Sequence, residues 1–192
     1  MPANSSLNIP NLLSLFRIAL IPIFVAIFYL PIPGNHLICA LIFAVAAFTD
    51  WLDGYLARRL NQMSRFGAFI DPVADKLIVA IALILLVAQE PVPWFTIPAL
   101  IIVGREIVVS ALREWMAELG KRTNIAVIKV AKYKTAAQMV AIFLLILAHP
   151  DRINTFQQVT MMSGYVLLYI AAILTLWSMV IYLKAAWRDL WG

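Results

Sequence analysis

Four aspartates stand close together in a chain that is otherwise mostly hydrophobic. Asp50 and Asp53 lie near the end of one long apolar run, and Asp71 and Asp75 lie near the start of the next. A carboxylate beside hydrocarbon is costly unless a cation or a water-filled cavity compensates it, so four together indicate a functional site. Because no Cys or His is nearby, these residues form an all-oxygen ligand set. Such a set suits Mg²⁺ or Mn²⁺, with Ca²⁺ possible, better than zinc.

Helical spacing would bring the four carboxylates together. Residues three and four positions apart share one face of a helix, so Asp50 and Asp53 share one stripe and Asp71 and Asp75 share another. The connection between the two segments is short, which predicts antiparallel neighbouring helices. Two carboxylates from each helix could then hold two cations, an arrangement used for in-line phosphoryl displacement. The alternative is solvated helix-end charge paired with nearby basic residues, namely Arg58, Arg59, Arg65 and Lys76.

The segments that carry these aspartates are predicted to cross a membrane. Hydrophobic residues make up 64% of the 192 residues, and charged residues make up 13%, about half of a soluble domain's share. The apolar runs are continuous, which favours helices. We therefore expect an all-α polytopic membrane protein, one domain over residues 1–192, with six transmembrane helices in one bundle. The expected spans are approximately 12–30, 36–60, 67–88, 94–118, 131–148 and 158–183.

The distribution of basic residues predicts the orientation of this bundle. Cytoplasmic ends of membrane helices carry an excess of Lys and Arg. On one side of the predicted bundle lie Arg58, Arg59, Arg65, Lys121, Arg122, Lys129, Lys132, Lys134, Lys184 and Arg188. The turns on the opposite side contribute only Arg152. Both termini and the four aspartates are therefore expected to face the cytoplasm.

The stretch from Asp50 to Asp75 resembles the signature of the CDP-alcohol phosphatidyltransferases, D-x2-D-G-x2-A-R-x8-G-x3-D-x3-D. The fixed positions are occupied by Asp50, Asp53, Gly54, Ala57, Arg58, Gly67, Asp71 and Asp75. The resemblance implies a CDP-linked lipid donor, release of CMP and two divalent cations, Mg²⁺ or Mn²⁺. It implies Asp50, Asp53 and Asp71 as metal ligands, and Asp75 as a ligand of the second metal and general base. The implied donor nucleotide and pyrophosphate pocket comprises Asp53, Gly54, Ala57, Arg58 and Gly67.

Four cations in or beside the fourth and fifth spans indicate an anionic acceptor. They are Arg105, Arg113, Lys132 and Lys134. Arginine binds phosphate bidentately and lysine adds a point charge, so we expect this group to face the aspartates and bind a phosphorylated alcohol. The alternative for the lysines is the positive-inside bias. For Arg105 the alternative is pairing with Glu106, Glu114 or an aspartate.

Three further segments resemble one branch of the family, the bacterial phosphatidylglycerophosphate synthases. They are Asn8–Arg17, the pairs Arg105-Glu106 and Arg113-Glu114, and Lys132–Gln138. The implied reaction transfers the phosphatidyl group of CDP-diacylglycerol to glycerol 3-phosphate, giving phosphatidylglycerophosphate and CMP. Alternative acceptors are inositol phosphate, inositol, serine and phosphatidylglycerol. More remote alternatives are an intramembrane prenyltransferase and a cation channel or transporter.

The same resemblance implies a cellular setting and partners. We expect a multi-pass protein of the bacterial cytoplasmic (inner) membrane, acting in anionic phospholipid biosynthesis, with its active site facing the cytoplasm. A homodimer is expected, and no nucleic-acid partner is expected. Arg17 stands near the start of the first span, where it could help to hold a phosphate. We favour the alternative that its side chain extends along the helix to the interface.

Overall fold

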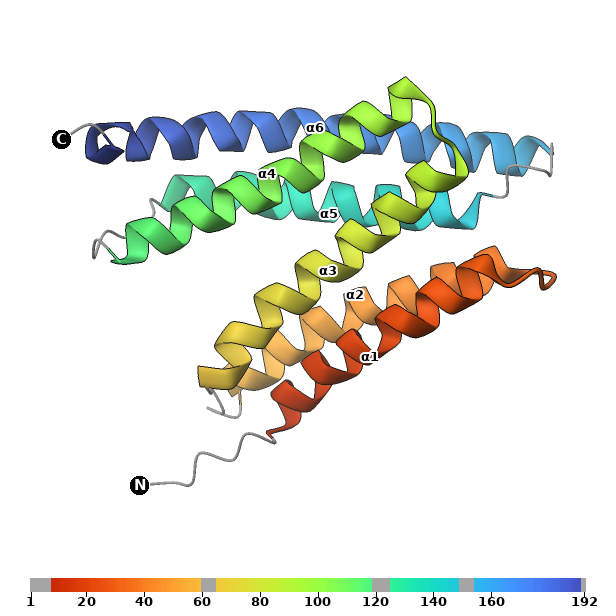
Figure 1. The fold of residues 1–192 in the computed structure, drawn as a ribbon, viewed down its shortest axis with the longest axis horizontal. Coiled ribbons are helices and arrows are strands. Elements are labelled where there is room, and N and C mark those ends of the chain that lie inside the picture. Colours follow the sequence, from red (N-terminus) through yellow and green to blue (C-terminus); the bar gives the residue numbers. More distant parts are fainter. Residues whose placement is uncertain (1–7, 60–64, 119–124, 149–153, 191–192) are drawn as a thin grey trace. The chain divides into compact units, whose positions relative to one another are not determined.

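The computed structural model describes residues 8–59, 65–118, 125–148 and 154–190. Those residues form six helices, drawn in Figure 1. Their bounds are α1 Ile9–Tyr29, α2 Asn35–Arg59, α3 Arg65–Gln89, α4 Pro93–Glu118, α5 Ile125–Leu147 and α6 Thr155–Leu190. The predicted all-α fold is confirmed, whereas the orientation of the termini stays a prediction.

Local sequence explains how α1 begins and ends. Asn8 is extended at the N-cap with φ −84° and ψ 156°, and a proline at the first positions of the helix supplies a preset φ. The helix closes at Leu30, whose N–H donates to the carbonyl of Ile27 at 3.2 Å. The turn to α2 needs Gly34, because its φ of +81° lies in the left-handed region that side chains disfavour. The first helical hairpin is therefore specified by its own residues.

Two helices extend beyond the predicted spans. The sequence predicts a polar connection over residues 120–130, but α5 already begins at Ile125. Helix α6 continues to Leu190, past the predicted end at residue 183. The predicted spans stay predictions, because hydropathy marks where a chain can enter hydrocarbon and a helix can continue past that point. Helices continue into the interface wherever residues with adequate helix propensity follow.

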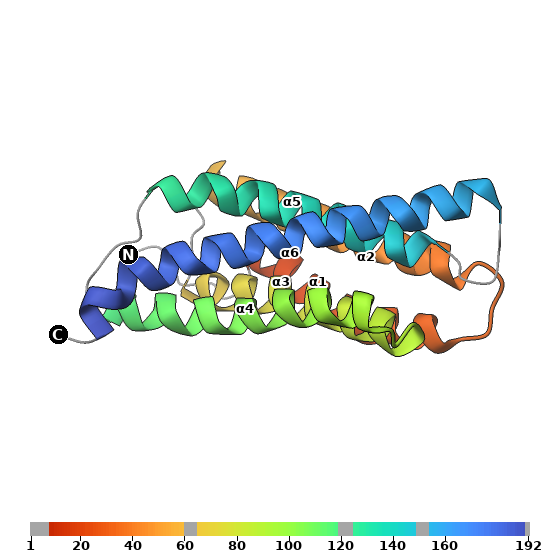
Figure 2. The same cartoon turned by 90° about the horizontal axis from the view of Figure 1, so that it is seen from above.

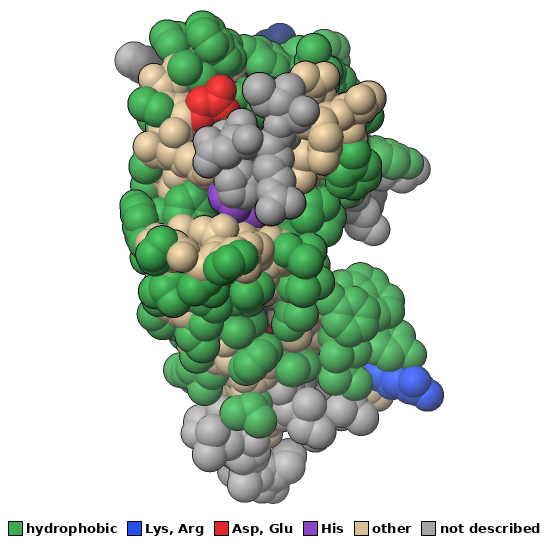
Figure 3. Space-filling view, turned by 90° about the vertical axis from the view of Figure 1, so that its right-hand side faces the viewer, with side chains coloured by type: hydrophobic (Ala, Val, Ile, Leu, Met, Phe, Trp, Pro, Cys, Tyr) green, Lys and Arg blue, Asp and Glu red, His purple; other side chains and the backbone are tan. Residues whose placement is uncertain are grey.

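Membrane-spanning character is clear for four of the described helices. The stretches Asn11–Tyr29, Asn35–Leu56, Pro93–Glu118 and Thr155–Lys184 are long and apolar enough to cross a membrane. Helix α5 adds a shorter apolar stretch, Tyr133–Leu147. Large hydrophobic side chains are exposed on all six helices, and hydrophobic atoms dominate the face drawn in Figure 3. Such a surface suits lipid rather than water.

The chain divides into two compact units, which are described separately. Unit 1 comprises Met1–Leu86 and Ile146–Gln157, and unit 2 comprises Val87–Leu145 and Gln158–Gly192. In unit 1, Phe24 on α1 and Phe43 on α2 are almost fully buried. The predicted single-domain organisation stays a prediction.

Unit 2 holds α4, most of α5 and most of α6, and the views in Figures 1 and 2 agree that α5 and α6 run alongside each other. Gly164 allows this close approach, since a Cβ there would meet Leu145 Cγ at 2.8 Å. Tyr165 ties the start of α6 to the turn before α4 by donating to Glu90 Oε2 at 2.8 Å. Tyr169 donates to the Trp94 carbonyl at 2.7 Å. These contacts fix the register of α6 against α4 and its preceding turn.

Candidate active site

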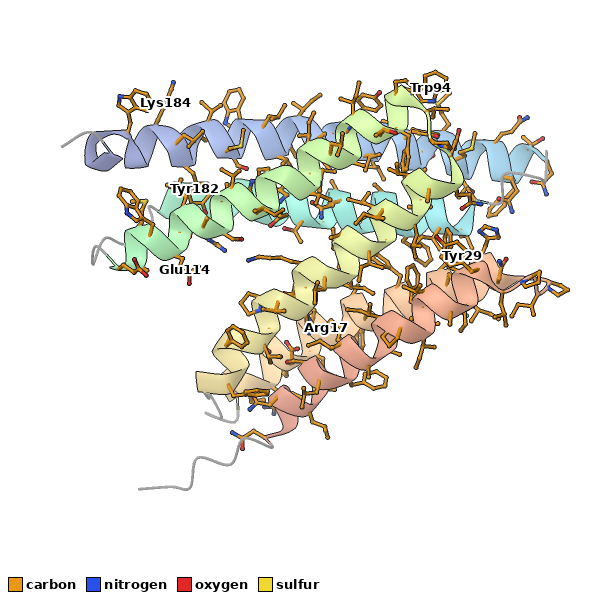
Figure 4. All side chains as sticks on the ribbon, viewed as in Figure 1. Arg17, Tyr29, Trp94, Glu114, Tyr182 and Lys184 are labelled. Atoms are coloured by element: carbon orange, nitrogen blue, oxygen red, sulfur yellow. The ribbon has the colours of Figure 1, made fainter. Side chains whose placement is uncertain are left out.

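Unit 1 gathers three aspartates around the side chain of Arg17. Arg17 Nη1 lies 3.3 Å from Asp50 Oδ1 on α2 and also pairs with Asp75 Oδ1 on α3. Its Nη2 pairs with Asp53 Oδ2 on α2. Arg17 is fully buried, and Figure 4 labels it on α1. One guanidinium on α1 thus joins carboxylates from two other helices.

Ser14, one turn before Arg17, brings in the fourth aspartate. Its hydroxyl donates to Asp71 Oδ1 and lies 3.5 Å from Asp53 Oδ2. Ser14 is fully buried, as is Asn11, one further turn along the same face of α1. The structure therefore brings together the predicted set, called here the aspartate cluster: Asp50, Asp53, Asp71 and Asp75.

The favoured interpretation of Arg17 was wrong. An extended side chain reaching the interface would be exposed, but Arg17 has 0% relative exposure. The desolvation cost of burying the guanidinium is offset here because carboxylates surround it and accept charge-assisted hydrogen bonds. The sequence interpretation weighed Arg17 alone, without partners from distant parts of the chain.

Within the described part of the chain, Arg59 does not pair with these carboxylates although it is close to them in sequence. Arg59 instead donates from Nη1 to the Tyr55 hydroxyl at 2.9 Å and lies over that ring. The side chain of Arg65 lies outside the described residues. The interpretation of the aspartates as solvated charge, paired along their own helices, is therefore disfavoured by the ion pairs with Arg17.

Burial differs across the aspartate cluster. The side chain of Asp53 is only 4% exposed, whereas those of Asp50 and Asp75 are each 42% exposed. One part of the cluster is therefore closed by protein, and another remains accessible to a ligand.

The chemistry of the cluster suits a hard divalent cation. Its donors are carboxylate oxygens, and the described part of the chain supplies one guanidinium among four carboxylates. Three of these carboxylates surround Arg17, and no group of three or more His, Cys, Asp or Glu residues in the described ranges is arranged as a metal site. The donor type fits Mg²⁺ or Mn²⁺, while the assignment of individual ligands stays a prediction.

The predicted donor pocket is described in part. Gly54 on α2 is half-buried beside Asp53, and Gly67 on α3 is buried. The side chains of Ala57 and Arg58 lie outside the described residues. Their predicted roles in nucleotide and pyrophosphate binding therefore stay predictions.

Unit 2 contains a second polar cluster, built from three helices. Arg105 on α4 is 8% exposed and donates from Nη2 to Ser178 Oγ on α6 at 2.7 Å. Its Nη1 lies 3.3 Å from Glu106 Oε1, which also pairs with Lys134 Nζ on α5. The Tyr182 ring centroid lies 5.8 Å from Arg105 Cζ. We call Arg105, Glu106 and Lys134 the cation cluster.

Among the side chains that the structure describes, two of the four predicted acceptor cations, Arg105 and Lys134, belong to this cluster. Arg105 and Lys134 share Glu106, whereas Arg113 is exposed two turns further along α4. The side chain of Lys132 lies outside the described residues. Pairing with Glu106, the alternative considered for Arg105, is present. That the cations face the aspartates stays a prediction.

The sequence interpretation gave no role to Ser14, although Ser14 lies within the Asn8–Arg17 segment, and it did not single out Ser178. Both are fully buried and each contacts a charged group of its unit. A signal existed for Ser14, because Asn11, Ser14 and Arg17 repeat every three residues along an otherwise apolar helix. No comparable pattern marks Ser178, whose partner is 73 residues away.

Comparison with known proteins agrees with the motif. The model of the family described as CDP-alcohol phosphatidyltransferase matches residues 7–181. A protein of Yersinia enterocolitica named CDP-diacylglycerol–glycerol-3-phosphate 3-phosphatidyltransferase is 53% identical over 184 residues, covering 96% of this chain and 97% of its own. Proteins of the same name from Pectobacterium atrosepticum and Escherichia coli K12 are 56% and 55% identical over 183 residues, covering 95% of this chain and 97% of their own.

Proposed function

Because the chain belongs to the CDP-alcohol phosphatidyltransferase family, we propose that it transfers the phosphatidyl group of CDP-diacylglycerol to glycerol 3-phosphate. The products are phosphatidylglycerophosphate and CMP. The observation that carries the proposal is the aspartate cluster, in which four carboxylates at the family's motif positions converge from α2 and α3. The relatives' names support glycerol 3-phosphate as the acceptor.

Divalent cations are the cofactors that this donor set would hold. The family is generally dependent on them. Asp50, Asp53 and Asp71 would bind the first cation, and Asp75 would contact a second, Mg²⁺ or Mn²⁺ in each case. When bound, such cations neutralise the pyrophosphate and stabilise the leaving CMP. The half-exposed carboxylates of Asp50 and Asp75 offer the approach for the pyrophosphate.

Asp75 is the proposed general base. Its side chain is 42% exposed on α3, so a substrate hydroxyl can reach it. The carboxylate would accept the proton of the primary hydroxyl as the hydroxyl oxygen attacks the β-phosphorus of CDP-diacylglycerol. A new phosphorus–oxygen bond forms and the bond to CMP breaks. A positioned base activates a hydroxyl that is otherwise a weak nucleophile.

The cation cluster is the proposed binding site for the acceptor phosphate. Arg105 and Lys134 carry two positive charges against the single carboxylate of Glu106, so the cluster keeps an excess positive charge for a phosphate. Ser178 holds the Arg105 guanidinium in place. Lys132 and the exposed Arg113 would add charge at the entrance.

The remaining donor contacts are proposed from the motif. Gly54 and Gly67 lack side chains that would block the nucleotide, and Ala57 is small. Arg58 would bind the pyrophosphate together with the cations. Asp53, which is buried and paired with Arg17, would bind the metal and also line the donor pocket.

The cellular setting follows from the helices and the relatives. The four long apolar helices indicate a membrane protein, and the similar proteins are bacterial. We place it in the bacterial cytoplasmic membrane, with the aspartate cluster facing the cytoplasm in keeping with the basic ends. A homodimer is part of this proposal.

CMP release tests the acceptor. The purified protein in detergent receives CDP-diacylglycerol, Mg²⁺ or Mn²⁺, and in turn glycerol 3-phosphate, inositol phosphate, inositol, serine or phosphatidylglycerol. We expect glycerol 3-phosphate to stimulate release most strongly, and excess EDTA to stop it. Stimulation by another acceptor alone would refute the acceptor assignment while leaving the family chemistry intact.

A further inference from the structure

The buried position of Arg17 has a consequence for cation binding. Its Nη1 contacts the oxygens of both Asp50 and Asp75, and its Nη2 contacts Asp53. These carboxylates come from α2 and α3, while Arg17 comes from α1. Three of the four oxygen donors proposed for the metals therefore already share one positive charge, and that charge cannot retreat to solvent because Arg17 is fully buried.

We infer that Arg17 and the divalent cation compete for the carboxylates of the aspartate cluster, so that Arg17 weakens metal binding while holding the cluster together. This inference rests on the proposed metal site. A cation among the same oxygens would lie close to the guanidinium, and two like charges in a poorly solvated site repel. The coupling is reciprocal, because bound metal must weaken the interaction between Arg17 and the carboxylates by the same free energy.

The opposite effect, in which Arg17 assembles the site and thereby tightens metal binding, is opposed by the packing. Asp50 and Asp53 are fixed one turn apart on α2, and α1 packs extensively along that helix. Ser14 holds Asp71 beside Asp53 through its own hydroxyl, without any contribution from Arg17. Removing the guanidinium therefore leaves the carboxylates close together. The remaining effect is the loss of a positive charge, which strengthens cation binding.

The consequence is a site that remains assembled at low cation concentration. Without Arg17, four neighbouring carboxylates would repel one another and lower the stability of the helices that carry them. With Arg17 present, the described cluster has an internal counterion that the protein never loses. The cation then exchanges without the cluster coming apart.

The test measures cation binding in the absence of substrate. Mn²⁺ is titrated into the purified protein in detergent, free Mn²⁺ is read from its electron paramagnetic resonance signal, and melting temperatures are recorded in EDTA and in Mn²⁺. For Arg17→Gln we expect Mn²⁺ to bind at least about tenfold more tightly than to wild type, because a nearby like charge is gone. We also expect a lower melting temperature in EDTA, and a larger gain on adding Mn²⁺.

Two controls separate the possible outcomes. Arg59→Gln removes the same charge from the exposed end of α2, where Arg59 contacts Tyr55, and should leave Mn²⁺ binding within about twofold of wild type because exposed charges are screened. Asp53→Asn should weaken Mn²⁺ binding strongly, which locates the cation at the cluster. Where Arg17→Gln does not fold, Arg17→Met replaces it, since methionine also removes the positive charge and keeps a long unbranched side chain, and tighter binding is again expected.

Unchanged or weaker Mn²⁺ binding in folded Arg17 variants would overturn the inference. Absence of Mn²⁺ binding to wild type, or binding that survives Asp53→Asn, would instead overturn the proposed metal site on which the inference rests.

Discussion

Ser178→Ala tests whether the buried guanidinium of Arg105 binds the acceptor phosphate. Arg105 Nη2 donates to Ser178 Oγ at 2.7 Å, and both residues are buried. A hydrogen bond to a charged group contributes about 1.5–3 kcal/mol. Glu106 at 3.3 Å and the Tyr182 ring still restrain the guanidinium, so we expect the lower end of that range. About 1.4 kcal/mol corresponds to a tenfold change in an equilibrium constant.

The assay follows CMP release while each substrate is varied in turn. The KM for glycerol 3-phosphate should rise roughly tenfold in Ser178→Ala, because a misplaced guanidinium binds ground state and transition state equally poorly. The KM for CDP-diacylglycerol and the kcat should stay within about twofold of wild type, because the change touches only acceptor binding.

Ser110→Ala is the matched control for this variant. Ser110 lies on the same helix as Arg105 and donates to the Glu106 carbonyl at 2.6 Å, so the same atom is removed without touching the guanidinium contact. We expect its acceptor KM to match wild type. An unchanged acceptor KM in Ser178→Ala, or an equal rise in Ser110→Ala, would refute the assignment of Arg105 to the acceptor.

Three further predictions probe the base, the acceptor site and the packing. Asp75→Asn should abolish turnover while leaving the protein folded and able to bind CDP-diacylglycerol, and near-normal activity would remove the general-base assignment. Arg105→Ala should raise the acceptor KM by more than tenfold and more than the donor KM, by the loss of a charged hydrogen bond, and the reverse would move Arg105 to the donor site. Gly164→Ala should lower stability by about 1–3 kcal/mol because its Cβ would meet Leu145 at 2.8 Å. Gly104→Ala, where a Cβ meets nothing within 4 Å, should not lower the melting temperature, and similar losses in both would contradict the packing argument.

The helices and the aspartate cluster could be predicted because their signals are local. Asp50 and Asp53 are three residues apart, Asp71 and Asp75 are four apart, and the short connection makes their helices neighbours. The first hairpin is equally local, with a proline near the start of α1 and Gly34 in the turn. Periodicity and turn chemistry act within a few residues, so the sequence displays them directly.

The partners of buried charges could not be predicted in this way. The hydrogen bonds of Arg17 to Asp50 and Asp53 span 33 and 36 residues, and that of Arg105 to Ser178 spans 73. Which helix faces each arginine depends on how the helices pack, and hydropathy does not encode that choice. For Arg17 the local alternative, an extended side chain at the interface, was therefore favoured although the carboxylates were already present in the sequence.

Pairing within the protein does not exclude ligand binding by the same residues, and the balance of formal charge decides the kind of ligand. In unit 1 one guanidinium stands among four carboxylates, and this negative excess suits divalent cations. In unit 2 one carboxylate, Glu106, is shared by Arg105 and Lys134, and this positive excess suits a phosphate. In each unit one residue of opposite charge, Arg17 in unit 1 and Glu106 in unit 2, pairs with the like-charged side chains around it. This pairing reduces the repulsion among the like charges without cancelling it. Glu106 is therefore comparable to Arg17, as a built-in counterion that keeps like charges together where a ligand of the opposite sign can bind.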